Sequence, residues 1–480
     1  MRQFIQQQVT KVQISVAKIY FNNNYEKRGF FKTWFFTKNN TKSEYFRIFW
    51  LLTVMGSIVT TYIMITNQIN RFYNNPTVMS LDRDYRAWNG TLPGLTLCYH
   101  DKMDISKADD YIQEKWNITP NDNDYSYFLE FLYAVVNSTA YNYGDLVKFA
   151  EDERFDDINL YEIVKLIDRS FLQDLTTFRN NVKVHVIRVM TERGMCYAIN
   201  APMAKMLSEN NKNIQNIEKS ILCEYGKHQC FIKMDIFDSV GTIEVHSPYE
   251  VSASDAGVGA IEMIKANEIY ASYKVTETFA SETLRDLDPE QRKCVFFDEP
   301  TSGLNIYSKT LCLARCRAVM ALEMCNCVPF FYPFVDGIRC NPAGFECLLD
   351  FKWPIWALHI CKCPSTCTEH VYSVHSIKTN PWSGTTTENS KISSSFRWDI
   401  VPPKVRMRRD VVFSFEDLLV SVGGAIGLFL GASILTLVKI GIISLQWFIE
   451  NFILLITKMK NCSLKIRIRK RKPKITEQNN

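Results

Sequence analysis

The sequence predicts an α+β membrane protein in which two transmembrane helices flank a large, disulfide-rich extracellular domain with a β core and peripheral helices. Two apolar stretches support this prediction: Ile48 to Thr66 has 19 residues without a charge, and Leu418 to Val438 has 21. Each can cross the roughly 30 Å hydrocarbon core of a bilayer as a helix. The third observation is that fourteen of the 15 cysteines lie between these stretches, and only Cys462 lies outside them.

The charges at the two ends of the chain predict its orientation. Residues 1–45 carry eight Lys or Arg against two Glu, and residues 458–480 carry nine against Glu477. By the positive-inside rule, both ends are expected to be cytoplasmic. The first apolar stretch starts too late and is too long for a cleavable signal peptide, so we expect a signal anchor. The basic tail follows a membrane helix directly, which favours an anchor to lipid headgroups over a nucleic-acid patch.

The predicted organisation has five parts. They are a cytoplasmic N-terminus (1–45), a first transmembrane helix (46–68), an extracellular cysteine-rich domain (69–411), a second transmembrane helix with the pore (412–457) and a basic cytoplasmic tail (458–480). The predicted extracellular residues 69–411 carry 37 Lys and Arg against 45 Asp and Glu, a net charge of −8. Such a balance enriches cations nearby, but it is also ordinary for secreted domains.

The cysteines predict disulfides, because the count is even and the compartment is oxidising. Up to seven bridges are possible, and the sequence alone leaves their connectivity open. Ten of the cysteines form a near-palindromic cluster, namely Cys294, Cys312, Cys316, Cys325, Cys327, Cys340, Cys347, Cys361, Cys363 and Cys367. The end of this cluster, with His370 nearby, could also supply zinc ligands. In an extracellular segment we favour disulfides, and we expect no metal and no cofactor.

Glycines punctuate the second apolar stretch at every fourth position. Gly423, Gly427 and Gly431 share one helix face, where backbones can approach closely inside a membrane. Such a face is typical of plain helix association, and it can also line a pore. The apolar material continues to Thr457, which makes about 60 Å of straight helix from Leu418. A helix twice as long as the bilayer core must break, tilt or emerge.

The residue order within this stretch indicates a family. Gly-Leu-Phe-Leu-Gly-Ala-Ser-Ile-Leu-Thr, from Gly427, resembles the second transmembrane segment of the degenerin/epithelial sodium channel superfamily. The segments that begin at Arg47 (Arg-Ile-Phe-Trp-Leu) and at Ser281 (Ser-Glu-Thr-Leu-Arg-Asp-Leu-Asp-Pro-Glu-Gln-Arg-Lys-Cys) resemble the insect pickpocket branch. The resemblance implies a trimeric channel fold and no enzyme. The extracellular part indeed contains no nucleophile elbow, phosphate loop or paired-histidine metal helix.

The resemblance also implies a disulfide pairing. Its nested ladder corresponds to that of the superfamily's thumb domain, and two further bridges lie before it. The implied pairs are Cys98–Cys196, Cys223–Cys230, Cys294–Cys367, Cys312–Cys363, Cys316–Cys361, Cys325–Cys347 and Cys327–Cys340.

The pore residues implied by the resemblance belong to the second apolar stretch. Gly431, Ala432 and Ser433 stand at the selectivity filter, where carbonyl and hydroxyl oxygens replace part of an ion's hydration shell. The remaining pore and gate positions are Val420, Ser421, Gly424, Gly427 and Lys439.

Three departures from the superfamily pattern affect this interpretation. Val420 stands where relatives have a small residue, and Ser421 stands where acid-sensing members have a carboxylate. Lys439 replaces a glutamate, so a ring of three lysines would repel cations unless the side chains snorkel to the interface. Near the N-terminus, Arg28-Gly29 occupies the position of the superfamily's His-Gly pair.

Several other features are assigned from pattern. Residues 101–180 are expected to form a peripheral, locally helical insertion, and residues 308–324 a helix. Residues 242–251 alternate between apolar and polar side chains, as a β-strand with one buried face does. This pattern places His246 at a strand end in a structural role. Asn89, Asn117 and Asn137 head N-glycosylation sequons in the predicted extracellular part.

Taken together, these observations predict a subunit of a sodium-permeable, amiloride-sensitive cation channel in the plasma membrane, gated through its extracellular domain. Its expected partners are sodium ions, the bilayer and two further subunits, identical or related, with no nucleic acid. The alternative is an auxiliary subunit that conducts poorly alone. ATP-gated channels and a two-pass ectoenzyme are weaker alternatives. The gating stimulus is not predicted.

Overall fold

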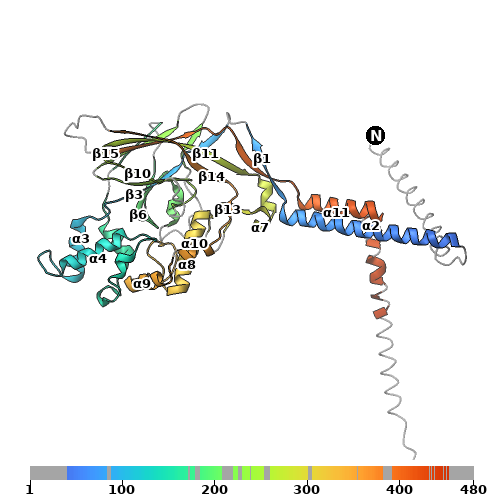
Figure 1. The fold of residues 1–480 in the computed structure, drawn as a ribbon, viewed down its shortest axis with the longest axis horizontal. Coiled ribbons are helices and arrows are strands. Elements are labelled where there is room, and N and C mark those ends of the chain that lie inside the picture. Colours follow the sequence, from blue (N-terminus) through green and yellow to red (C-terminus); the bar gives the residue numbers. More distant parts are fainter. Residues whose placement is uncertain are drawn as a thin grey trace, which may run out of the picture. The chain divides into compact units, whose positions relative to one another are not determined.

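The computed structural model of the chain describes residues 41–83, 88–170, 173–178, 184–207, 220–224, 230–237, 239–252, 260–300, 305–353, 355–381, 392–431 and parts of 433–452. The chain divides into two compact units, which we describe separately. The stem unit comprises Met1–Phe72 and Phe413–Asn480, and the disulfide-rich unit comprises Tyr73–Val412. Figure 1 shows the elements of both.

Two helices are the main elements of the stem unit. Helix α2 (Thr41–Asn74) includes 27 residues, Ile48–Asn74, that are apolar and long enough to cross a membrane. Five Ser and Thr hydroxyl groups along it are satisfied inside the helix; for example, Thr61 Oγ1 donates to the Ser57 carbonyl oxygen at 2.7 Å. This matters in lipid, because no water is present to serve as a partner. The described helix extends beyond the predicted 46–68 at both ends.

Helix α11 (Phe415–Leu430) follows a capping box in which Ser414 and Asp417 bond to each other's backbone N–H groups. This helix has 16 residues, so α2 alone among the described helices is long enough to span a membrane without interruption. The predicted second span is therefore not one continuous helix in the structure.

Two sheets form the centre of the disulfide-rich unit. The larger has the order β1-β16-β11-β15-β8-β4, with β14 also paired to β11, and the smaller has the order β10-β9-β3-β6-β5. Their bounds are β1 Thr77–Asp82, β16 Arg406–Val411, β11 Asn267–Ala280, β15 Ile392–Val401, β8 Phe231–Phe237, β4 Gln173–Thr177, β14 Glu369–Pro381, β10 Ile261–Glu262, β9 Gly241–His246, β3 Gly94–Tyr99, β6 Gly194–Ile199 and β5 Val186–Thr191. Short pairs join β2 (Asn89–Thr91) to β7 (Leu222–Glu224) and β12 (Cys294–Val295) to β13 (Ser365–Thr366).

One apolar core lies between the two sheets. It combines buried side chains of the larger sheet, such as Trp398 and Ile232, with those of the smaller one, such as Leu95 and Ile243. Strand β8 alternates strictly between buried and half-buried residues, as expected of a strand with one face on a core. His246 ends β9, where its Nε2 lies 2.8 Å from Thr96 Oγ1, so it holds the structural place that the sequence predicted.

Helices pack around a second core. Helices α3 (Ile105–Trp116), α4 (Tyr125–Asn137), α5 (Gly144–Val147) and α6 (Leu160–Ile167) confirm the helical character predicted for 101–180. Helices α8 (Lys309–Cys325), α9 (Pro342–Asp350) and α10 (Ile355–Ile360) share this core with them. Aromatic rings dominate it: Phe131 and Phe155 stack with centroids 4.0 Å apart. Short helices η3 (Pro202–Leu207), η5 (Glu282–Asp286) and α7 (Pro289–Arg292) lie elsewhere in the unit.

Seven disulfides cross-link the unit, and they join the cysteines that the resemblance implied. The pairs are Cys98–Cys196, Cys223–Cys230, Cys294–Cys367, Cys312–Cys363, Cys316–Cys361, Cys325–Cys347 and Cys327–Cys340. The cysteines considered as zinc ligands are all engaged in these bridges. The mixed helix and strand architecture with a disulfide framework is confirmed.

A buried ion pair connects helix α8 to the turn between β5 and β6. Arg317 on α8 is fully buried, and its Nε donates to Glu192 at 2.7 Å. The Tyr332 hydroxyl donates to the same carboxylate oxygen at 2.7 Å, and Trp353 Nε1 donates to the Arg317 carbonyl oxygen at 3.1 Å. This network orients α8 on the sheet, because each charged group finds its partner only in this arrangement.

We predict that Arg317→Met destabilises the protein strongly, because it leaves the Glu192 carboxylate buried without its countercharge. Breaking a buried pair in this way costs about 3–5 kcal/mol. The check is the melting temperature of the purified full chain. Lys148→Met is the matched control, since it removes an exposed lysine that pairs with Asp145 at 2.9 Å and should leave the melting temperature almost unchanged. Equal melting of the two variants would contradict the account.

Candidate pore segment and its attachment

Side chains along α11 divide into a covered face and an open face. Residues 418, 422, 425 and 429 are partly covered, and they recur at the three- and four-residue spacing of one helix face. The predicted pore positions Val420, Gly424 and Gly427 lie on the opposite face and are exposed. Ser421 lies between the two faces and is partly covered.

The covered face of α11 is matched by a covered stripe on α2. Ser57, Thr61, Ile65, Gln68 and Phe72 are its covered residues, again three or four positions apart. The Phe72 ring meets the Phe415 ring at 6.3 Å, and Figure 1 shows the two helices side by side. Helix α2 therefore packs on one side of α11, and the glycine face of α11 is turned away from it.

The glycine face is open in the single chain. A Cβ atom added at Gly423 or Gly424 would meet nothing within 4 Å, and the Val420 side chain is 74% exposed. Apolar residues left uncovered on a membrane helix need lipid, another helix or a pore around them. Small residues allow the closest approach of another helix, and they leave the most room for water.

The helix is interrupted at the predicted filter. Gly431 has φ of +61°, in the left-handed region, and ends α11 as its C-cap. Helical residues resume at Leu435, where Ser433 and Thr436 cap the new segment: Ser433 N–H donates to Thr436 Oγ1 at 2.7 Å, and Thr436 Oγ1 donates to the Ser433 carbonyl oxygen at 2.6 Å. Lys439 lies exposed on the resumed helix. Ala432 lies outside the described residues, as do Arg28, Gly29 and Cys462.

Strands β1 and β16 are the parts of the disulfide-rich unit nearest in sequence to the stem helices. They pair antiparallel from Thr77↔Val411 to Asp82↔Arg406, and Val412 N–H donates to the Pro76 carbonyl oxygen at 2.9 Å. One strand follows α2 and the other precedes α11 along the chain. Three residues, 412–414, separate the end of β16 from the start of α11.

The thumb, which we define as the segment from Ser281 to Cys367, contacts β16 at its base. Ser281 N–H donates to the Arg409 carbonyl oxygen at 3.0 Å, and Val411 packs against a small core that contains the Cys294–Cys367 bridge. Buried Arg292 organises this base: its Nε donates to the Cys294 carbonyl oxygen at 2.9 Å, and its guanidinium also bonds Glu299. No sequence pattern marked Arg292, because most of its partners are backbone carbonyl groups.

A charged cluster lies on the same sheet. Glu277 on β11 is almost fully buried, bonds Arg406 on β16 and stands opposite His370 on β14. Burial lowers the pKa of His370; the Glu277 carboxylate opposes this shift, and Arg406 adds to it. The folded protein therefore favours the neutral imidazole.

The three sequon residues are exposed at their positions. Asn89 begins β2, Asn117 is the left-handed C-cap of α3, and Asn137 is the last residue of α4. Their side chains are thus accessible to a modifying enzyme.

These features define an integral-membrane protein that combines apolar helices with a large disulfide-bonded unit. The profile of the family described as "Amiloride-sensitive sodium channel" matches residues 24–443. The chain therefore belongs to this family, whose members are cation channels and not enzymes. The resemblance to the degenerin/epithelial sodium channel superfamily and its insect pickpocket branch is confirmed.

Relatives align with most of the chain at low identity. "Sodium channel protein Nach" of Drosophila ananassae is 22% identical over 441 residues, 84% of this chain and 82% of the relative. "Bile acid-sensitive ion channel" of Homo sapiens is 22% identical over 450 residues, 86% and 82% of the two chains. "Pickpocket protein 19" of Drosophila melanogaster is 21% identical over 448 residues, which are 82% of this chain and 84% of the relative.

Among solved structures, the "Cryo-EM structure of a proton-activated chloride channel" covers 85% of this chain and 100% of its own. The TM-score is 0.31 at 6% identity, a likeness too low to support an argument.

The pKa of His370 predicts a dependence of stability on pH. The pKa of His370 in the folded protein lies below its value of about 6.5 in the unfolded chain, so the unfolded chain binds the proton more readily. His370 therefore leaves the free energy of unfolding undiminished above pH 6.5 and lowers it as the pH falls below that value. The melting temperature should thus fall from pH 7.5 to 5.5, and His370→Gln should reduce that fall. His375→Gln, an exposed histidine on the same strand, is the control. An identical pH profile for native and His370→Gln proteins would contradict the assignment.

Proposed function

We propose that the chain is a pore-forming subunit of a sodium-permeable, amiloride-sensitive cation channel in the plasma membrane. The observation that carries the proposal is the interruption of an apolar helix at Gly431, in line with an open glycine face, in a member of a sodium channel family. Irregular backbone inside a membrane is tolerated where it lines water.

In this proposal both termini are cytoplasmic, residues 46–68 and 412–457 cross the membrane, and residues 69–411 are extracellular. Three copies, identical or related, surround a common axis with their glycine faces inward. Carbonyl groups of Gly431 and Ala432, with Ser433, form the filter. Because Ser433 and Thr436 already cap the following helix through each other, carbonyl oxygens are the better candidates for ion contacts.

Gating in this proposal proceeds through the extracellular part. A ligand or force that moves the thumb acts on β16 through the hydrogen bond from Ser281 to Arg409 and the packing around Val411. Strand β16 then displaces the start of α11. The thumb moves as a body, because five disulfides tie its helices together.

Lys439 favours a second candidate, an auxiliary subunit that needs partners with acidic residues at this level. Three lysines near a narrow axis repel cations, whereas three glutamates attract them. The two candidates differ in what the chain conducts alone.

We predict a small amiloride-blocked sodium current from the native chain under voltage clamp and a several-fold larger one from Lys439→Glu. Lys378→Glu, an equal charge reversal at an exposed position of β14, should leave the current unchanged. Surface biotinylation confirms delivery, and replacement of sodium by a large organic cation should abolish the current. Current from the mutant alone supports the auxiliary candidate; silence of both at normal surface levels contradicts a cation pore.

A second prediction concerns Gly431, whose left-handed backbone disfavours any residue with a Cβ atom by roughly 1–2 kcal/mol. Gly431→Ala should alter the sodium-to-potassium permeability ratio, because the filter backbone must shift to relieve this strain. Gly441→Ala is the matched control, since Gly441 lies in regular helix with nothing within 4 Å of the added Cβ. Unequal surface delivery is excluded by the same biotinylation. An unchanged ratio in Gly431→Ala would argue against Gly431 as a filter residue.

A further inference from the structure

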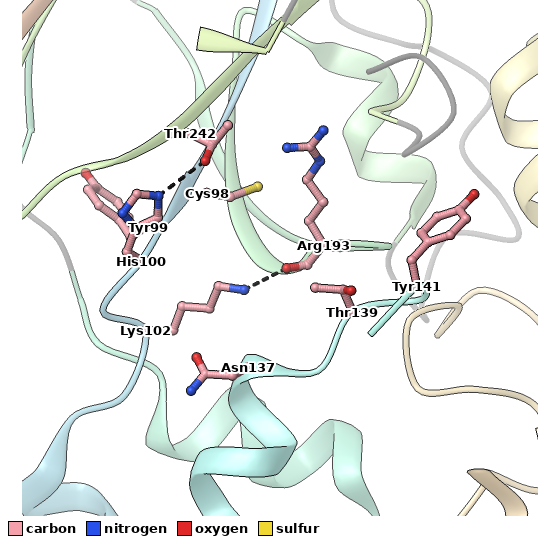
Figure 2. Close-up of a pocket in the computed structure, with 9 residues that line it drawn as sticks. All are labelled: Cys98, Tyr99, His100, Lys102, Asn137, Thr139, Tyr141, Arg193 and Thr242. Carbon is pink, nitrogen blue, oxygen red and sulfur yellow. Dashed lines mark hydrogen bonds between the residues drawn. The ribbon is translucent and has the colours of Figure 1, made fainter. Parts of the chain in front are cut away.

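A pocket of about 500 Å³ opens between the segment after β3, the end of α4 and the turn between β5 and β6 (Figure 2). Lys102 and Arg193 supply its charges, and Thr139, Tyr141 and Thr242 also line it. No acidic residue is among its described lining residues. This volume is in the range of pockets that hold small organic ligands.

The two cations share this pocket without a carboxylate between them. Lys102 Nζ donates to the Arg193 carbonyl oxygen at 2.7 Å, which leaves two of its three N–H groups available. Burial lowers the pKa of Lys102 to about 8, with the nearby Asp168 carboxylate opposing the shift and Arg193 adding to it. The ammonium is thus short of negative charge.

Acidic groups do lie near the pocket, but each has another partner. The Glu244 carboxylate accepts from Ser252 at 2.6 Å and is 4.0 Å from Arg193 Nε. The Glu262 carboxylate is 2.7 Å from His100 Nε2. Among the residues that the structure describes, Arg193 meets a carboxylate, that of Glu244, at the outer limit of an ion-pair distance.

The turn that carries Arg193 is shaped around the Lys102 ammonium. Gly194 has φ of +90°, and a Cβ atom at this position would lie 3.0 Å from Lys102 Nζ. The neighbouring Cys98–Cys196 bridge fixes β3 to β6 beside it. The Lys102 ammonium is consequently held in place by the fold.

We propose that this pocket binds a small organic anion, whose carboxylate or sulfonate group lies between Lys102 and Arg193 and whose body rests against Tyr141. Charge-assisted hydrogen bonds from the two cations hold the acidic group, and the hydroxyl group of Thr139 orients the ligand. The site lies within the disulfide-rich unit and does not depend on the proposed pore.

The test is calorimetric titration of the purified full chain, in a neutral detergent, with benzenesulfonate. The native chain should bind one equivalent saturably. Lys102→Met should weaken binding by roughly tenfold or more, as expected for loss of a charged hydrogen-bonding partner. Lys115→Met removes the same charge from an exposed position on α3 that does not line the pocket, and it should bind like the native chain.

Titrations with two further ligands separate the contribution of the acidic group from that of the ligand's apolar body. Sulfate tests the charged group alone and should bind more weakly, and benzyl alcohol, which lacks the charge, should not bind. Arg193→Gln serves if Lys102→Met does not melt like the native protein. Because Asn137 also lines the pocket, the titration is repeated after removal of N-glycans. The absence of saturable binding in both preparations, or native-like binding by both pocket variants, would overturn the proposal.

Discussion

The packing of α11 on α2 through one face is the constraint on which the rest of the stem unit depends. With residues 418, 422, 425 and 429 covered, the glycine face is the side of the helix that stays open. The left-handed turn at Gly431 then interrupts the helix in line with that face. An uninterrupted helix could satisfy its backbone anywhere in the bilayer, but an interrupted one needs water or protein beside it.

The disulfide-rich unit is divided by its bridges into a few stiff parts. Bridges tie α8 to the segments around it, and the ion pair between Arg317 and Glu192 fixes that helix to the sheet below. At the other end, the base of the thumb meets β16 through backbone hydrogen bonds and a small apolar core. Stiff parts joined at a small contact transmit displacement, whereas a uniformly soft domain would absorb it.

Much of this architecture follows from sequence pattern. The even cysteine count, the apolar stretches and the glycine spacing are local or countable features, and they predicted the fold class. The length of the apolar material required the second helix to break, tilt or emerge, without choosing among the three. The structure adds what depends on contacts between distant residues. Arg292 bonds backbone carbonyl groups, and Lys102 meets Arg193 across 91 positions of the chain, so no spacing rule could identify either. The face of α11 that packs on α2 was likewise hidden, because both faces are apolar.

The most direct test of the pore assignment is the reactivity of single cysteines on α11 toward a charged, membrane-impermeant thiol reagent on intact cells, in a Cys462→Ser background. Thiolates form only where water is present, so reaction reports a water-lined face. The account predicts labelling of Gly427→Cys and none of Ala425→Cys, whose position lies on the covered face. Labelling of Ala425→Cys without Gly427→Cys would contradict it, because the water-lined face would then be the one assigned to α2.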